Sequence, residues 1–242
     1  MKKGGKCPLG WVALVFTLCS SGTCSKTKQV EQSSGWRAAL RASTVAVAPA
    51  VNLSGSLDFD RNRFADLMAI ELTEAEGVTV IPVSRVIAVL SGQGRETVGS
   101  PQQVAELGEL LQADAVLVFA VTAYEPYQPP VIGISAQLYG RAQARAVSSS
   151  DTRTAFRQQH AGDSNGPDSW GLLAQTQRVF HGGDDSVRKE VQRYAKTRTA
   201  EGSPYGWRKF FVSQQDYIRF CCFSVIGALL EDAQRNDKID IP

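Results

Sequence analysis

The strongest constraint on this fold is the alternation of short apolar runs with helical patterns between residues 44 and 123. The first run, residues 44–51, reads TVAVAPAV, and residues 78–81 and 115–123 are similarly apolar. A continuous apolar run of this length is typical of a strand covered on both faces. Because strands that alternate with helices form layers with parallel pairing, we predict an α/β fold.

Helical patterns fill the gaps between these runs. One helix begins at Arg61 and is predicted to end at Gly77 as a C-cap. A short helix is expected over residues 83–90, and a third begins after Ser100, an N-cap followed by proline. Each presents one apolar face. The predicted buried positions are Phe64, Leu67, Met68 and Leu72 in the first helix and Val104, Leu107, Leu110 and Leu111 in the third.

The second half of the chain adds strands and two helices. Residues 131–144 alternate between apolar and polar, which predicts a half-exposed strand antiparallel to the third strand. A last strand is expected over residues 172–180, and two further C-terminal helices begin at Asp184 or Asp185 and near Ser213. The prediction is a mixed four- to five-stranded sheet, in two or three layers, with helices packed on it.

The amino terminus predicts export. Lys2, Lys3 and Lys6 precede an apolar run over residues 8–18, and small residues follow. This order is typical of a secretory signal peptide. The run has about 11 residues, whereas a spanning helix needs roughly 20. We therefore expect an exported protein of the periplasm or outer membrane.

Composition and polarity divide the rest of the chain. The predicted parts are a signal segment (1–24), a polar tether (25–42), a single α/β domain (43–235) with a long polar loop (146–169), and a tail (236–242).

The 242 residues carry a net charge of only +2, which gives no electrostatic reason to expect a nucleic acid partner.

Five cysteines suggest an anchor but no disulfide framework. Cys24 follows the signal segment, where bacterial lipoproteins carry their acyl chains, although Ser21 and Thr23 depart from the usual pattern. Acylation at Cys24, simple cleavage, and an uncleaved anchor all stay open. Cys221 and Cys222 are adjacent, and neighbouring cysteines seldom bond to each other.

The candidates for catalysis all have simpler explanations. His160 and His181 lie in polar segments without a serine or cysteine nucleophile in a recognisable context. Asp184 and Asp185 are neighbours at a helix start, where carboxylates usually act as caps. We therefore predict no catalytic residue and no enzymatic activity.

The sequence contains only incomplete motifs for metal and phosphate binding. Asp58, Asp60 and Asn62 resemble the first ligands of a calcium loop, but the glycine and glutamate that complete such a loop are missing. A helix start with solvated charges explains them better. The glycines between residues 92 and 99 lack a following Gly-Lys-Ser/Thr element. The sequence thus predicts neither a metal nor a cofactor.

The segment YEPYQPP between two predicted strands is the most unusual local feature. Its prolines stiffen the backbone, and tyrosine is enriched at energetically important interface positions. Tyr124, Tyr127, Pro129 and Pro130 are therefore candidate contacts for a partner protein. The alternative is a rigid turn whose tyrosines pack on the sheet edge.

The last predicted helix carries more apolar surface than one face requires. Between Tyr217 and Leu230 its apolar residues occupy two sides. Either the preceding helix covers the second side through Val187, Val191 and Tyr194, or that side is a protein–protein surface. We favour intramolecular cover.

Several short motifs resemble one superfamily, which contains the TolB amino-terminal domain, the curli secretion lipoprotein CsgG and the LpoB type of penicillin-binding-protein activator. The similarity extends over about residues 43–140. The motif positions are Asn52, Ser54 and Gly55; Ser84 and Arg85; Leu107, Gly108 and Leu111; and Ala113, Asp114, Val116 and Leu117. The chain departs from the family after residue 145.

The resemblance implies an envelope protein that binds other proteins. The main hypothesis is a non-enzymatic scaffold, anchored by a signal segment or lipid, that recruits an envelope protein partner. One alternative is a subunit of an oligomeric outer-membrane secretion assembly, which would need amphipathic strands of about 9–11 residues. Another is an exported hydrolase. Both a monomer and a homo-oligomer remain open.

Overall fold

The computed structural model describes residues 44–75, 77–141, 170–198 and 204–239. The helices are α2 (Arg61–Thr73), α3 (Val83–Gly92), α4 (Pro101–Leu111), α6 (Asp185–Thr197), α7 (Lys209–Val212) and α8 (Gln214–Ile239), with a 3-10 turn at Gly206–Arg208. The strands are β1 (Thr44–Val47), β2 (Val51–Asn52), β3 (Thr79–Ile81), β4 (Ala115–Glu125), β5 (Val131–Arg141) and β6 (Trp170–His181). The predicted signal segment, tether and polar loop, which include Cys24 and His160, lie outside these residues.

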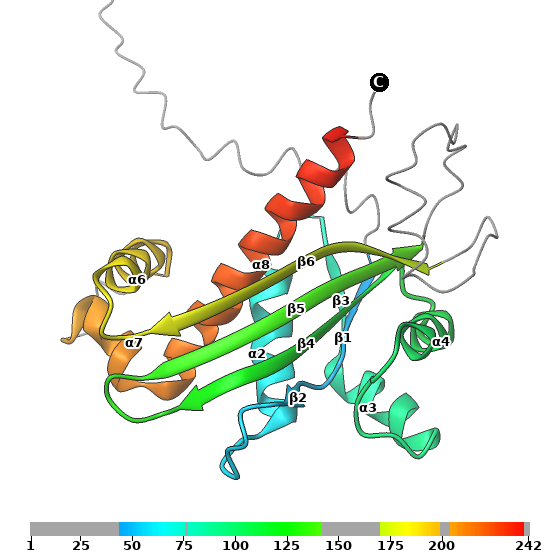
Figure 1. The fold of residues 1–242 in the computed structure, drawn as a ribbon, viewed down its shortest axis with the longest axis horizontal. Coiled ribbons are helices and arrows are strands. Elements are labelled where there is room, and N and C mark those ends of the chain that lie inside the picture. Colours follow the sequence, from blue (N-terminus) through cyan, green and yellow to red (C-terminus); the bar gives the residue numbers. More distant parts are fainter. Residues whose placement is uncertain (1–43, 76, 142–169, 199–203, 240–242) are drawn as a thin grey trace, which may run out of the picture. The chain divides into compact units, whose positions relative to one another are not determined.

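The strands form one mixed, six-stranded sheet, which confirms the predicted α/β class (Figure 1). Five strands follow the order β3-β1-β4-β5-β6, and β2 pairs with β4. Pairing is parallel among β1, β2, β3 and β4 and antiparallel for β4–β5 and β5–β6. The antiparallel pairing predicted for residues 131–144 is therefore confirmed for the described part of that segment.

The first predicted strand is divided in two, and this accounts for the sixth strand. β1 ends at Val47, and the chain pairs with β4 again from Val51. Pro49 lies between them and has no N–H group to donate to a ladder. Ala48 still donates its N–H to the Leu117 carbonyl at 2.9 Å. β1 and β2 therefore both pair with β4, one on each side of Pro49.

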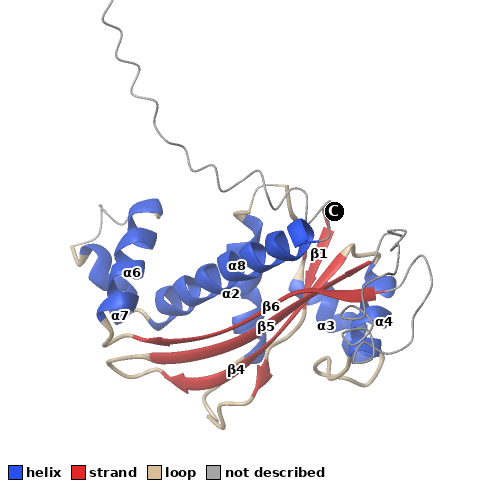
Figure 2. Ribbon diagram, turned by 45° about the horizontal axis from the view of Figure 1, so that its top comes forward, coloured by secondary structure: helices blue, strands red, loops and turns tan. Residues whose placement is uncertain are grey.

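Helices cover both faces of the parallel part of the sheet. Val45 and Val47 of β1 pack in a core with α2 and α8, whereas Ala46 packs in a second core with α3 and α4. Figure 2 shows α2 and α8 together on one side of the sheet. A strand with both faces buried needs the continuous apolar run seen in the sequence. The architecture is thus three-layered at β1.

The motif residues of the first loop build a tight turn after β2. The Asn52 side-chain oxygen accepts hydrogen bonds from the Ser54 N–H at 3.1 Å and the Ser54 hydroxyl at 2.8 Å. Gly55 follows with φ of 74°, a left-handed conformation that favours glycine. Further along, Asp114 accepts a hydrogen bond from the Thr44 N–H at 3.1 Å and so fastens β1 to β4. These family-like residues are structural.

Several boundaries differ from the sequence predictions. α2 ends at Thr73, with Glu74 as its C-cap, rather than at Gly77, which adopts φ of 83° in the turn that follows. Leu110 is 53% exposed because α4 buries Val104, Leu107, Gly108 and Leu111 instead. α8 continues to Ile239, past residue 235, where the sequence predicted a tail.

Both apolar sides of α8 are covered within the domain. Cys222 and Ile226, from its second side, are 0% and 5% exposed. The main cover comes from α2 and the sheet, not from α6 as predicted. α6 contributes Tyr194, whose ring lies 5.8 Å from Phe220 and 4.9 Å from Phe223. Among the described residues, no helix is both long enough and apolar enough to cross a membrane.

Candidate functional site

The turn between β4 and β5 is held by contacts with two other segments. The Gln128 side-chain amide donates a hydrogen bond to the Phe211 carbonyl at 3.0 Å. The Gly182 N–H, at the end of β6, donates to the Pro130 carbonyl at 2.8 Å. The Gln128–Pro129 peptide bond is cis. These contacts fix the proline-rich turn in place.

The turn separates exposed from buried side chains. Tyr127 is 79% exposed, and Pro129 is also exposed. Pro130 is buried, because the Gly182 backbone lies against its ring. The Tyr124 side chain is partly buried. Tyr127 and Pro129 are therefore accessible to solvent, whereas Pro130 packs inside the domain.

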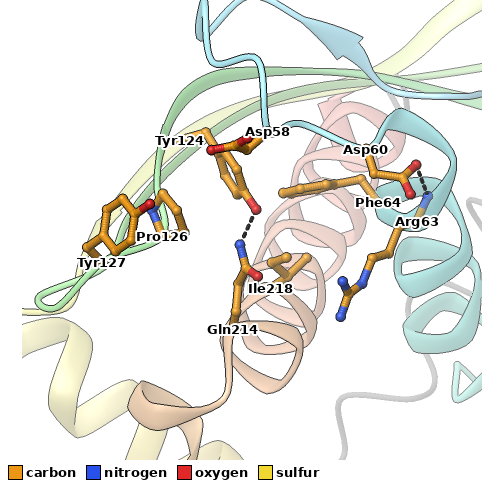
Figure 3. A pocket seen from close by; sticks show the side chains of 9 residues that line it. All are labelled: Asp58, Asp60, Arg63, Phe64, Tyr124, Pro126, Tyr127, Gln214 and Ile218. Atoms are coloured by element: carbon orange, nitrogen blue, oxygen red, sulfur yellow. Dashed lines mark hydrogen bonds between the residues drawn. The ribbon is translucent and has the colours of Figure 1, made fainter.

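A pocket of about 340 Å³ opens beside this turn (Figure 3). Its walls come from the loop before α2, the first turn of α2, the β4–β5 turn and the start of α8. The lining residues are Asp58, Asp60, Arg63, Phe64, Tyr124, Pro126, Tyr127, Gln214 and Ile218. The pocket thus joins two segments that the sequence singled out separately.

Tyr124 occupies the centre of this site. Its ring makes edge contacts with Phe59 and Phe64, at centroid distances of 5.9 Å and 5.5 Å. Its hydroxyl accepts a hydrogen bond from the Gln214 side-chain amide. Burial raises the pKa of Tyr124, the nearby Arg63 guanidinium opposes this rise, and Asp58 adds to it. The hydroxyl therefore stays neutral at physiological pH and can itself donate a hydrogen bond.

The charged residues of the pocket differ in the hydrogen bonds that their side chains form. One Asp60 oxygen caps α2 by accepting the N–H groups of Asn62 and Arg63, both at 3.0 Å. Arg63 donates to the Gln215 side-chain oxygen at 3.3 Å. Asp58 forms no hydrogen bond or ion pair with the part of the chain that the structure describes. Asp58 is thus the free charge of the site.

The remaining candidates are not brought into this pocket. His181 accepts a hydrogen bond at Nδ1 from the Gly183 N–H at 3.1 Å, and this nitrogen lies 3.7 Å from the Asp184 carboxylate. Asp184 stands at the N-cap of α6, and Asp185 lies 3.5 Å from Arg188. Asp184 makes no side-chain capping hydrogen bond. His181 and Asp184 thus flank a turn before α6, and the capping role predicted for Asp184 is wrong, because its carboxylate accepts no N–H group of the helix.

No metal-binding geometry occurs in the described ranges. No group of three or more histidine, cysteine or acidic side chains gathers there closely enough to hold an ion. Asp60 lies at the start of α2, as expected from the sequence, and its side chain caps the helix, which was not predicted. Gly94, in the loop after α3, has φ of 69° and serves a turn.

The sequence analysis did not predict the wall that α8 contributes to the pocket. Gln214 and Ile218 lie about 90 residues from Tyr124 and were predicted only as parts of a buried helix. Leu57, which precedes Asp58, is 100% exposed and was not noticed. A leucine and a phenylalanine inside the polar loop NLSGSLDFD were the available signal.

Comparisons with known proteins add structural neighbours. No family model and no curated protein matches the chain. Lipoprotein GNA1162 from Neisseria meningitidis is similar with a TM-score of 0.39 and 18% identity, over 67% of this chain and 99% of that one. The LpoB C-terminal domain from Salmonella enterica has a TM-score of 0.39 and 11% identity, over 60% and 92%.

A third neighbour is the PelC dodecamer from Paraburkholderia phytofirmans, with a TM-score of 0.35 and 13% identity, over 78% of this chain and 89% of that one. An LpoB domain, whose type the sequence motifs resemble, is thus among the structural neighbours.

Proposed function

We propose that this chain is an exported, membrane-tethered envelope scaffold that binds another protein and catalyses no reaction. The observation that carries the proposal is the exposure of Tyr127 on a turn that two other segments hold in place. A rigid, exposed tyrosine offers a large contact area at little entropic cost. Leu57 is fully exposed in the loop that also carries the lining residue Asp58.

The described cysteines argue against a thiol enzyme. Cys221 and Cys222 are both completely buried in α8. Burial raises the pKa of each thiol, so neither forms the reactive thiolate easily. A group that a substrate cannot reach does not serve as a nucleophile.

Export and anchoring rest on the amino-terminal pattern. Lys2, Lys3 and Lys6 before the apolar run over residues 8–18 support transfer out of the cytoplasm. A reporter fused after Lys26 should therefore leave the cytoplasm. Cys24→Ser should abolish fatty-acid incorporation and membrane retention if the anchor is a lipid; unchanged fractionation would assign the anchor to the signal segment.

Partner binding is tested by site-specific photocrosslinking in cells of the source organism. A benzoylphenylalanine at position 127 should give a discrete adduct with an envelope protein. The matched control places the same group at Leu110, which is 53% exposed on α4, away from the turn. No adduct from position 127, or the same adduct from both positions, would contradict the proposal.

A further inference from the structure

The pocket beside the β4–β5 turn contains an unused negative charge next to an aromatic ring. Asp58 and Tyr124 are neighbours (Figure 3), and Asp58 contributes to raising the pKa of Tyr124. Asp58 has no hydrogen-bond or ion-pair partner within the described residues. Asp60 lines the same pocket and uses one carboxylate oxygen, Oδ1, for capping. A ligand would therefore meet two carboxylates.

One positive charge lines the pocket beside these two carboxylates. Arg63 donates to the neutral side chain of Gln215 at 3.3 Å, so the lining keeps an excess of one negative charge. An acidic ligand would face this excess of negative charge, whereas a cationic one would be attracted to it.

The other walls suit a planar cation. Tyr124 and Tyr127 supply aromatic rings, and Pro126 adds an apolar surface. Aromatic faces attract cations, and arginine stacks on them while its N–H groups pair with carboxylates. The volume of about 340 Å³ lies at the small end of ligand pockets, which span roughly 300–1,000 Å³. One long side chain suits this space better than a large ligand.

We propose that the pocket receives an arginine side chain from the partner protein, with its guanidinium between Asp58 and the ring of Tyr124. This inference rests on the proposed function, since it names the chemistry of the partner at the same surface. Tyr127 and Leu57 contact the residues around that arginine, and the pocket supplies the specificity. Lysine would bind more weakly, because its ammonium group neither stacks nor pairs in a bidentate manner.

The probe is the peptide acetyl-Gly-Arg-Gly-amide, titrated into the isotope-labelled full chain in detergent and followed by NMR. We expect saturable shifts of the Asp58, Tyr124 and Tyr127 resonances. The neutral isostere acetyl-Gly-citrulline-Gly-amide should not saturate them. Asp58→Asn should weaken arginine binding about tenfold or more, because charge-assisted hydrogen bonds are roughly twice as strong as neutral ones.

The matched control is Asp66→Asn, which removes an exposed carboxylate of α2 that does not line the pocket. It should leave peptide affinity unchanged. Equal binding of the arginine and citrulline peptides, no saturable shift, or an Asp58→Asn variant with undiminished affinity would overturn the inference.

The two proposals fail separately. A photoadduct at position 127 that persists undiminished in Asp58→Asn would support partner binding and reject the arginine contact. Arginine-peptide binding that depends on Asp58, without any adduct from position 127, would support the pocket chemistry and reject the scaffold function.

Discussion

Glu71 of α2 accepts a hydrogen bond from Nε of Arg219 of α8 at 2.7 Å, although its carboxylate is completely buried. Its other oxygen lies 2.5 Å from Nη2 of Arg198, just beyond the end of α6, and the Tyr194 hydroxyl donates to the same oxygen as Arg219 at 3.0 Å. One carboxylate thus joins three helical segments that are far apart in sequence. A buried charge is tolerated only when it is paired in this way.

Removing this carboxylate should destabilise the domain. Glu71→Ala removes the ion-pair partner of Arg219 and leaves Arg198 with only the exposed Glu74, and breaking a buried pair costs about 3–5 kcal/mol. Urea unfolding followed by circular dichroism measures the change. The control is Glu74→Ala, whose side chain is 56% exposed and lies 3.1 Å from Arg198. It should cost less than about 1 kcal/mol; equal losses in both variants would refute a special role for Glu71.

Sequence patterns predicted the apolar core well but not this network. Phe64, Leu67, Met68 and Leu72 were expected to be buried, and all four are. Glu71 lies on the same face, where helical spacing places it, but its arginine partners are 127 and 148 residues away. Periodicity identifies which face of a helix is buried. It does not identify which distant charges meet there.

Local sequence patterns also predicted one part of the candidate site and not the other. The proline-rich turn was recognisable because its composition is unusual within a few residues. The pocket beside it also requires Asp58 and Gln214, from two other segments. Three chain segments meet only after the sheet and helices have formed, so local patterns could not reveal the pocket.

Gly108 has a packing role that the Leu-Gly motif alone did not explain. A Cβ atom there would lie 2.1 Å from the Trp170 ring. Alanine normally stabilises a helix by about 0.5–1 kcal/mol relative to glycine. Gly108→Ala should instead destabilise the domain by roughly 1–3 kcal/mol, because the indole must move.

The matched control for Gly108 is Gly227→Ala in α8, where nothing lies within 4 Å of the added atom. Thermal unfolding should show a higher Tm for Gly227→Ala and a lower Tm for Gly108→Ala. A gain of stability in both variants would mean that Trp170 does not pack on α4.

The two buried cysteines should be inert towards thiol reagents. Cys221 and Cys222 are inaccessible, and burial raises the pKa of both thiols. In a variant with the other three cysteines replaced by serine, Ellman's reagent should react only as fast as the domain unfolds. Rapid labelling of the folded protein would show that α8 opens to solvent.

Alkaline pH should destabilise the fold through Tyr217. Its hydroxyl donates to the Phe180 carbonyl at 3.1 Å, and burial raises the pKa of this phenol. In the unfolded chain a tyrosine ionises near pH 10, whereas the folded state keeps this proton to higher pH. Above pH 10 the unfolded state therefore binds fewer protons, and stability falls as the pH rises.

The contribution of Tyr217 can be isolated by substitution. Above pH 10, Tyr217→Phe should reduce the decline in unfolding free energy by about 1.4 kcal/mol per pH unit, the amount for one proton. Urea unfolding at several pH values measures this slope. Tyr127→Phe, which changes an exposed ring, should leave the slope unchanged. An identical slope in wild type and Tyr217→Phe would show that the Tyr217 phenol is solvated in the folded protein.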